Sequence, residues 1–162
     1  MEFKIPRSLK LQQEELQAEL VKLLFYLPYK AKKVSEKTRA AAEAAEKVLH
    51  SHFVKEEEFV FPPLALMPLL AEGKVRPEME SVLAMTEKLK TELPQMLEEH
   101  KAIGAALKSL MAAATKENKP EYVRFARKLM RYMQNEEHLF YPASMLVGEY
   151  LRLKLMKRDA QG

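Results

Sequence analysis

The stretch HFVKEEEFVFPP at positions 52–63 is expected to decide the fold, because it returns in altered form as YMQNEEHLFYPA at positions 132–143. In both copies, a residue with a ring stands four positions before the first acid of an acidic run, and a proline follows the apolar residues. Four positions make about one turn of an α-helix, so ring and carboxylate share one face. A second echo lies upstream of each copy, as QEEL at 13–16 and HKAI at 100–103. The chain is therefore expected to form two similar pairs of helices.

Periodic apolar residues and prolines predict where the helices lie. A stripe of leucines predicts the first helix over Pro6–Leu27, with Ser8 as its N-cap and Pro28 as its end. The second helix is expected from Ser35 to about Phe61, where Pro62 and Pro63 end it. The other two helices are expected over Glu78–Thr115, with a kink at Pro94, and over Pro120–Met156, with a bend at Pro142.

Four long helices with no credible strand predict one all-α domain over residues 1–162. The connections are short enough for neighbouring helices to run antiparallel, which gives an up-down four-helix bundle. The apolar segment Leu64–Leu70 is expected to cover one end of this bundle rather than to form a contact surface, because exposed apolar patches of that size are unusual.

Composition limits the function classes. The 162 residues contain no cysteine, which excludes disulfides, thiolate metal sites and cysteine nucleophiles. No signal peptide and no long apolar segment is evident, so a cytoplasmic protein that does not enter a membrane is expected. The net charge is only +4. Two basic clusters, at 30–39 and 152–158, lack interleaved stacking aromatic residues, so they are interpreted as solvated faces and not as a nucleic-acid site.

The two repeats also predict a metal site. A histidine and a carboxylate one turn apart, joined by ligands from other helices, are how bundles hold paired iron or manganese ions. The expected set is His52, Glu56, His100 and Glu136, with Gln13 and Tyr132 at the two remaining places.

The residues next to these candidates are not expected to bind the metal. His50 and His138 are expected to be bystanders, the acids Glu57, Glu58, Glu99 and Glu137 to be solvated, and the aromatic residues Phe59, Phe61, Phe140 and Tyr141 to pack in the core.

At these residues the chain resembles the hemerythrin-like, or HHE cation-binding, family. The resemblance also includes the segments IPRSL at 5–9, YPA at 141–143 and LVGEYLR at 146–152. It implies a bundle with a non-haem di-iron centre. The family's ligands are a histidine on the first helix, His-x3-Glu on the second, a histidine on the third and His-x3-Glu on the fourth.

Two positions depart from this pattern, since Gln13 and Tyr132 stand where the family has histidines. Reversible oxygen carriage is therefore not the expected function. Tyr132 could bind ferric iron as phenolate, donate a hydrogen bond to Glu56, or simply fill the vacated volume. The metal is expected to be iron, as two ions or one, although the same ligands also take manganese or zinc.

Three functions stay open at this point. The protein could act on dioxygen, peroxide or nitric oxide, it could sense a metal or such a molecule, or it could be a metal-free bundle that serves as an interaction module. The first is favoured, because both halves keep a glutamate at matching positions. Whether the protein is an enzyme stays open, and the sequence does not identify a protein partner.

Overall fold

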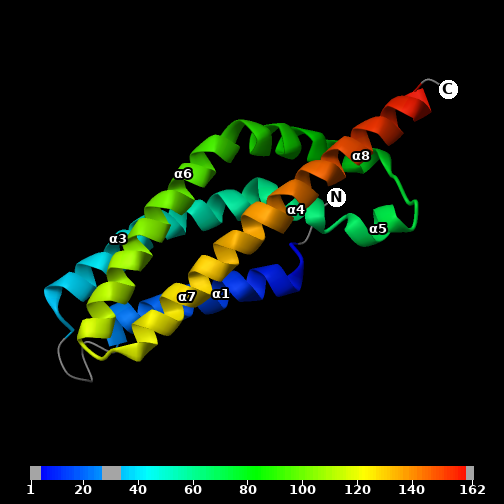
Figure 1. Cartoon of the computed structure of the whole chain (residues 1–162). Helices are drawn as coiled ribbons and strands as arrows, with labels where there is room; N and C mark the ends of the chain where they lie inside the picture. Colours follow the sequence, from blue (N-terminus) through cyan, green and yellow to red (C-terminus); the bar gives the residue numbers. More distant parts are fainter. Residues whose placement is uncertain (1–4, 27–33, 160–162) are drawn as a thin grey trace.

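The computed structural model describes residues 5–26 and 34–159, and in these residues the chain is helical with no strand. Figure 1 shows long helices that lie side by side and alternate in direction along the chain, which confirms the predicted up-down four-helix bundle. The first rod is α1 (Arg7–Val21) with the π-helical turn η1 (Lys22–Tyr26), and the second is α3 (Glu36–Lys55) with the π-helical turn η2 (Glu56–Val60) and α4 (Phe61–Leu64). The third rod is α6 (Ser81–Lys116), and the fourth is α7 (Pro120–Asn135) with the π-helical turn η4 (Glu136–Phe140) and α8 (Tyr141–Asp159). Two short helices, α5 (Met67–Ala71) and the 3₁₀ turn η3 (Pro77–Glu80), connect the second rod to the third.

Two helix starts test the sequence-based boundaries. Ser35 caps α3 as predicted, because its side chain accepts a hydrogen bond of 3.2 Å from the backbone N–H of Thr38. The prediction that Ser8 is the N-cap of the first helix is wrong, because α1 begins at Arg7 and Pro6 is at the N-cap position. The predicted break at Pro28 and the basic residues Lys30, Lys32 and Lys33 lie outside the described residues.

A π-helical turn precedes a proline in both repeats. The backbone N–H of Phe61 bonds to the carbonyl of Glu56, and that of Tyr141 bonds to the carbonyl of Glu136, five residues earlier in each case. Proline cannot donate a hydrogen bond, and its ring clashes with the carbonyl four residues before it. A wider turn accommodates this defect without ending the rod. The second rod therefore continues through Pro62 to Leu64 instead of ending near Phe61.

Proline also disturbs the two later rods. α6 runs unbroken through Pro94, and Figure 1 shows it bending in its first half, as predicted for a proline within a helix. Near Pro142 the disturbance is contained in η4, immediately before α8 begins.

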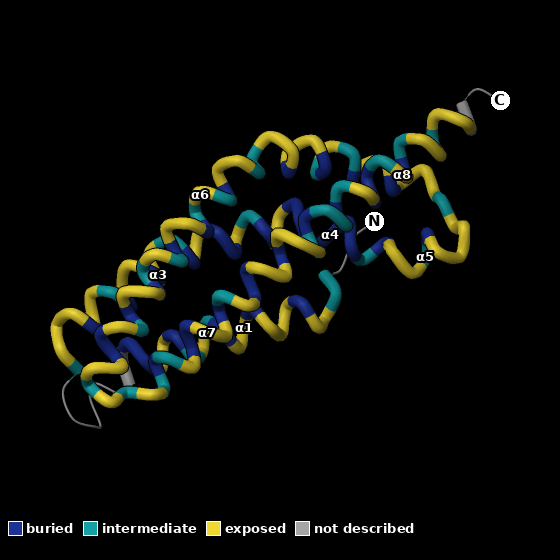
Figure 2. Tube along the Cα trace, in the orientation of Figure 1, coloured by how far each residue is buried: buried dark blue, intermediate teal, exposed yellow. Residues whose placement is uncertain are grey.

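The core lies between the rods, and buried positions recur on their inward faces (Figure 2). One end is closed by the segment after α4, where Leu66 and Leu70 pack with Met79 and Val82 in one buried cluster. This contact supports the expectation that 64–70 covers the bundle. Within the described part of the chain, no helix is both long and apolar enough to cross a membrane.

α8 approaches α6 closely at Gly148. A Cβ at this position would clash with the side chain of Thr86, which is fully buried. We expect Gly148→Ala to lower the free energy of unfolding by about 2 kcal/mol, because the two helices would have to separate. Gly104→Ala is the matched control, since its Cβ meets nothing within 4 Å, and it should be neutral or stabilising by up to about 1 kcal/mol. Urea denaturation measures both, and equal stabilities would contradict the close approach.

Candidate metal centre

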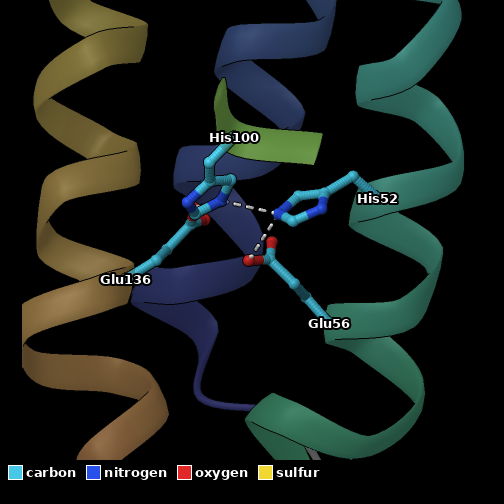
Figure 3. Close-up of side chains that lie close together, drawn as sticks. All are labelled: His52, Glu56, His100 and Glu136. Atoms are coloured by element: carbon cyan, nitrogen blue, oxygen red, sulfur yellow. Dashed lines mark hydrogen bonds and ion pairs between the residues drawn. The ribbon is translucent and has the colours of Figure 1, made fainter. Parts of the chain in front are cut away.

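Four side chains meet in the middle of the bundle, and all four were predicted to lie together. His52 belongs to α3, Glu56 to η2, His100 to α6 and Glu136 to η4. Each is 4% exposed or less. Each offers one ligand atom, and these atoms all lie within 4.8 Å of one another. Figure 3 shows the side chains converging from neighbouring rods.

The inner nitrogens of both histidines point to the centre of this group. His52 Nε2 lies 2.8 Å from His100 Nε2 and 3.4 Å from Glu56 Oε1 (Figure 3). His100 Nε2 lies 3.1 Å from Glu136 Oε2. The nitrogens and carboxylate oxygens thus share one small volume, as the ligands of a common cation do.

The outer nitrogens of the histidines are held by two further acids. His52 Nδ1 lies 2.8 Å from Glu99 Oε2, and His100 Nδ1 lies 2.7 Å from Glu137 Oε1. Lys55 donates a 2.7 Å hydrogen bond to Glu99 Oε1. A carboxylate on Nδ1 fixes the tautomer that leaves Nε2 free as a ligand and orients the ring.

Glu99 is half-buried rather than solvated, so the prediction of a solvated charge is wrong for it, whereas Glu137 is exposed as predicted but also contacts His100. Each adjoins a predicted ligand in sequence and so lies in the same layer of the bundle, which is the signal that could have revealed it. Glu57, Glu58, His50 and His138 are exposed, in agreement with their predicted roles.

Tyr141 is a second residue that the sequence analysis underestimated. It is buried as predicted, but its hydroxyl donates a 2.7 Å hydrogen bond to Glu56 Oε1. The same oxygen lies 3.1 Å from His52 Nε2 and 3.2 Å from His100 Nε2. Its ring also stacks on that of His100, with centroids 5.8 Å apart. Tyr141 occupies the place in its repeat that Phe61 has in the other, so the added hydroxyl was the available signal.

The two positions that depart from the family pattern behave differently. Gln13 is buried, and its Nε2 donates a 2.7 Å hydrogen bond to Glu56 Oε2. Tyr132 is also buried and packs edge-on against Phe53, with centroids 6.0 Å apart. Its hydroxyl makes no hydrogen bond within normal limits, although Glu136 and Gln13 lie near enough to influence its pKa. The suggested hydrogen bond from Tyr132 to Glu56 is therefore not formed.

Burial and neighbouring charges shift the pKa values in the cluster. Burial raises the pKa of the Glu136 carboxyl well above its ordinary value of 4.5, and the charge of Glu56 raises it further. Burial lowers the pKa of His52, but the hydrogen bonds and charges of Glu56 and Glu99 outweigh this effect and bring the pKa above 6.5. Burial and the charge of His52 lower the pKa of His100 below 6.5. The two Nε2 atoms lie 2.8 Å apart, so at most one of them can carry a proton in this contact.

Several buried oxygens of this cluster have no hydrogen-bond partner in the described structure. They are both carboxylate oxygens of Glu136, Oε1 of Gln13 and the Tyr132 hydroxyl. Unpaired buried polar atoms are costly and uncommon in native proteins, and each requires an explanation. A cation bound among carboxylate and amide oxygens would satisfy them. The residues present therefore fit a metal ion.

The contact between Glu99 and His52 carries a testable consequence. Glu99→Gln should weaken metal binding by about 10- to 100-fold, because a neutral amide orients the imidazole less firmly and makes it a weaker donor. Glu98→Gln is the matched control, since Glu98 is exposed and pairs only with Lys101 one turn away. Competition with a chromophoric chelator measures the affinities. Equal values for the two variants would contradict an orienting role for Glu99.

Comparison with known proteins agrees with this geometry. The chain matches the family described as the Hemerythrin HHE cation binding domain over residues 12–144, which include all six predicted ligand positions. No curated protein and no solved structure matches the chain.

Proposed function

Because the chain belongs to the hemerythrin family of HHE cation-binding domains, we propose that it is a non-haem di-iron protein. The residues that would hold the metal are His52, Glu56, His100 and Glu136. Its proposed role is to act on or sense a small molecule, namely dioxygen, peroxide or nitric oxide. Bound iron would supply the redox and Lewis-acid chemistry that such molecules require.

The unpaired oxygens of Glu136 are the observation that carries this proposal. A buried carboxylate without donors is unfavourable unless a cation balances it. Glu56, by contrast, already accepts hydrogen bonds from Gln13 and Tyr141. The histidine nitrogens and carboxylate oxygens together suit iron, and availability decides between iron, manganese and zinc as much as affinity does.

The chain's own residues keep bulk water away from the proposed ligands, each of which is 4% exposed or less. Tyr132 lines a surface hollow of about 190 Å³ together with Gln12, Leu16 and Asn135, and its hydroxyl is buried. None of the four proposed ligands lines this hollow. Such burial favours a small molecule such as dioxygen, peroxide or nitric oxide over a larger substrate.

The two replaced histidines favour chemistry or sensing over reversible oxygen carriage. Gln13 offers a neutral amide, and its nitrogen is already bonded to Glu56. With fewer imidazole donors than the family pattern supplies, the site relies more on oxygen ligands. Such ligands stabilise the higher oxidation state of iron, which disfavours repeated oxygen release.

Metal content followed by peroxide turnover tests the proposal. The freshly purified protein should contain up to two iron ions per chain and should consume hydrogen peroxide faster than free iron does. His100→Ala should lose the metal, whereas His138→Ala, which alters an exposed histidine, should keep it. Iron without turnover would point to sensing. A protein that takes up no iron, manganese or zinc would support the alternative of a metal-free interaction module.

A further inference from the structure

The family pattern has six ligand positions, and Tyr141 stands at none of them. Its hydroxyl nevertheless lies among the proposed metal ligands. Tyr141 and Phe61 are related by the repeat, since each follows a π-helical turn, precedes a proline and is buried. Phe61 packs in an apolar cluster with Phe59 and Leu64. Tyr141 adds one oxygen at the matching place of the other half, and this oxygen reaches the centre of the site.

The distances around this oxygen resemble those between the ligands of one ion. The hydroxyl lies 2.7 Å from Glu56 Oε1, 3.1 Å from His52 Nε2 and 3.2 Å from His100 Nε2. The two nitrogens are 2.8 Å apart, and His52 Nε2 is 3.4 Å from Glu56 Oε1. With metal–ligand bonds of about 2.1 Å, adjacent ligands of an octahedral ion lie about 3.0 Å apart. One ion can therefore contact all four atoms with only small movements.

We propose that Tyr141 is a metal ligand of this protein and binds ferric iron through its phenol oxygen beside His52, His100 and Glu56. This inference rests on the proposed metal centre and adds a residue to it. Coordination would replace the phenol O–H bond with an oxygen–iron bond, and the proton would pass through Glu56 Oε1, which accepts the hydrogen bond, to bulk water. That Glu56 oxygen would then be free to bind metal.

Tyr132 is the competing tyrosine, because it stands at a family ligand position. Its hydroxyl makes no hydrogen bond of normal geometry and its nearest polar neighbours are Glu136 and Gln13, whereas the Tyr141 hydroxyl lies within 3.2 Å of three proposed ligand atoms on His52, His100 and Glu56. The structure thus assigns the phenolate to Tyr141. A phenol oxygen at this place also compensates in part for the two imidazoles that the chain lacks.

The test is the visible spectrum of the ferric protein at known iron content, for the wild type, Tyr141→Phe and Tyr132→Phe. Phenolate bound to ferric iron gives a broad visible charge-transfer band, which imidazole and carboxylate ligands do not give. We expect the wild type to show this band, Tyr141→Phe to lose it, and Tyr132→Phe to keep it. Phenylalanine should be tolerated at 141, since Phe61 fills the matching place.

Three results would overturn the inference while the metal centre stands. They are an iron-loaded wild type without the band, a band that survives in Tyr141→Phe, and a band that disappears only in Tyr132→Phe. A wild type that binds no metal would overturn both the inference and the proposed function. If Tyr141→Phe does not fold, crystals of the iron-loaded wild type decide the question. A Tyr141 oxygen at bonding distance from the anomalous iron peak supports ligation, and an oxygen only hydrogen-bonded to Glu56 refutes it.

Discussion

Stripping the metal from the purified protein with a chelator should lower its melting temperature by about 8–16 °C. A ligand present at about 1,000 times its dissociation constant stabilises the native state by about 4 kcal/mol, and each kcal/mol shifts the melting temperature of a chain of this size by about 2–4 °C. The physical reason is the cluster itself, where two buried carboxylates lie close together and Glu136 has no hydrogen-bond donor. Differential scanning calorimetry before and after chelation measures the effect.

Adding iron back should restore the original melting temperature, and His100→Ala should show little response to chelator or iron. His138→Ala is the control that keeps the full response, because His138 is exposed and away from the cluster. If chelated and metal-loaded wild type melt at the same temperature while metal content differs, the metal does not bind at these buried carboxylates.

The four rods could be predicted because local signals agree along each of them. The segment between Ser35 and Leu49 consists mainly of strong helix formers, and Ser35 supplies the cap that starts it. The end of this rod was misplaced for a physical reason. Proline at position 62 forbids an ordinary helical hydrogen bond, but a π-helical turn avoids the clash, and sequence patterns do not distinguish a break from such a turn.

The inner ligands could be predicted because their geometry is local. His52 and Glu56 share a face by their spacing of four, and the repeat places His100 and Glu136 in the other half. Glu99 and Glu137 could not be assigned in this way, because each contacts a histidine on a different rod. Such contacts depend on how the helices are rotated about their axes, which tertiary packing determines.

Gln13 and Glu56 show how the chain adapts to a lost ligand. The Gln13 amide donates to Glu56 Oε2, so one of the two proposed carboxylate ligands is stabilised by the residue that replaces the family's histidine. Neither oxygen of Glu136 has a hydrogen bond among the described residues, although His100 Nε2 lies 3.1 Å from its Oε2. The two halves of the site are therefore electrostatically unequal, and Glu136 is the carboxylate that depends most on a cation.

Glu136→Gln should raise the stability of the metal-free protein by about 3 kcal/mol at neutral pH and abolish tight metal binding. Removing an uncompensated buried charge relieves a penalty of several kcal/mol, and the amide has nearly the same volume as the carboxyl group. The Glu57→Gln control, at an exposed position of the matching π-helical turn η2, should change stability by less than about 0.5 kcal/mol.

The difference in stability between Glu136→Gln and wild type should depend on pH, and this dependence shows whether the Glu136 carboxyl group causes it. Since the pKa of Glu136 is raised above 4.5 in the folded protein, folding favours its protonated form. Its contribution to wild-type stability is full below pH 4.5 and is lost as the pH rises through its raised pKa. The gap between Glu136→Gln and wild type should therefore be small in acid, widen as the pH rises and level off above that pKa. Urea unfolding of both chelated proteins over this range measures the gap. A constant gap would show that folding does not shift the pKa of Glu136, and would contradict a buried carboxylate that depends on a cation.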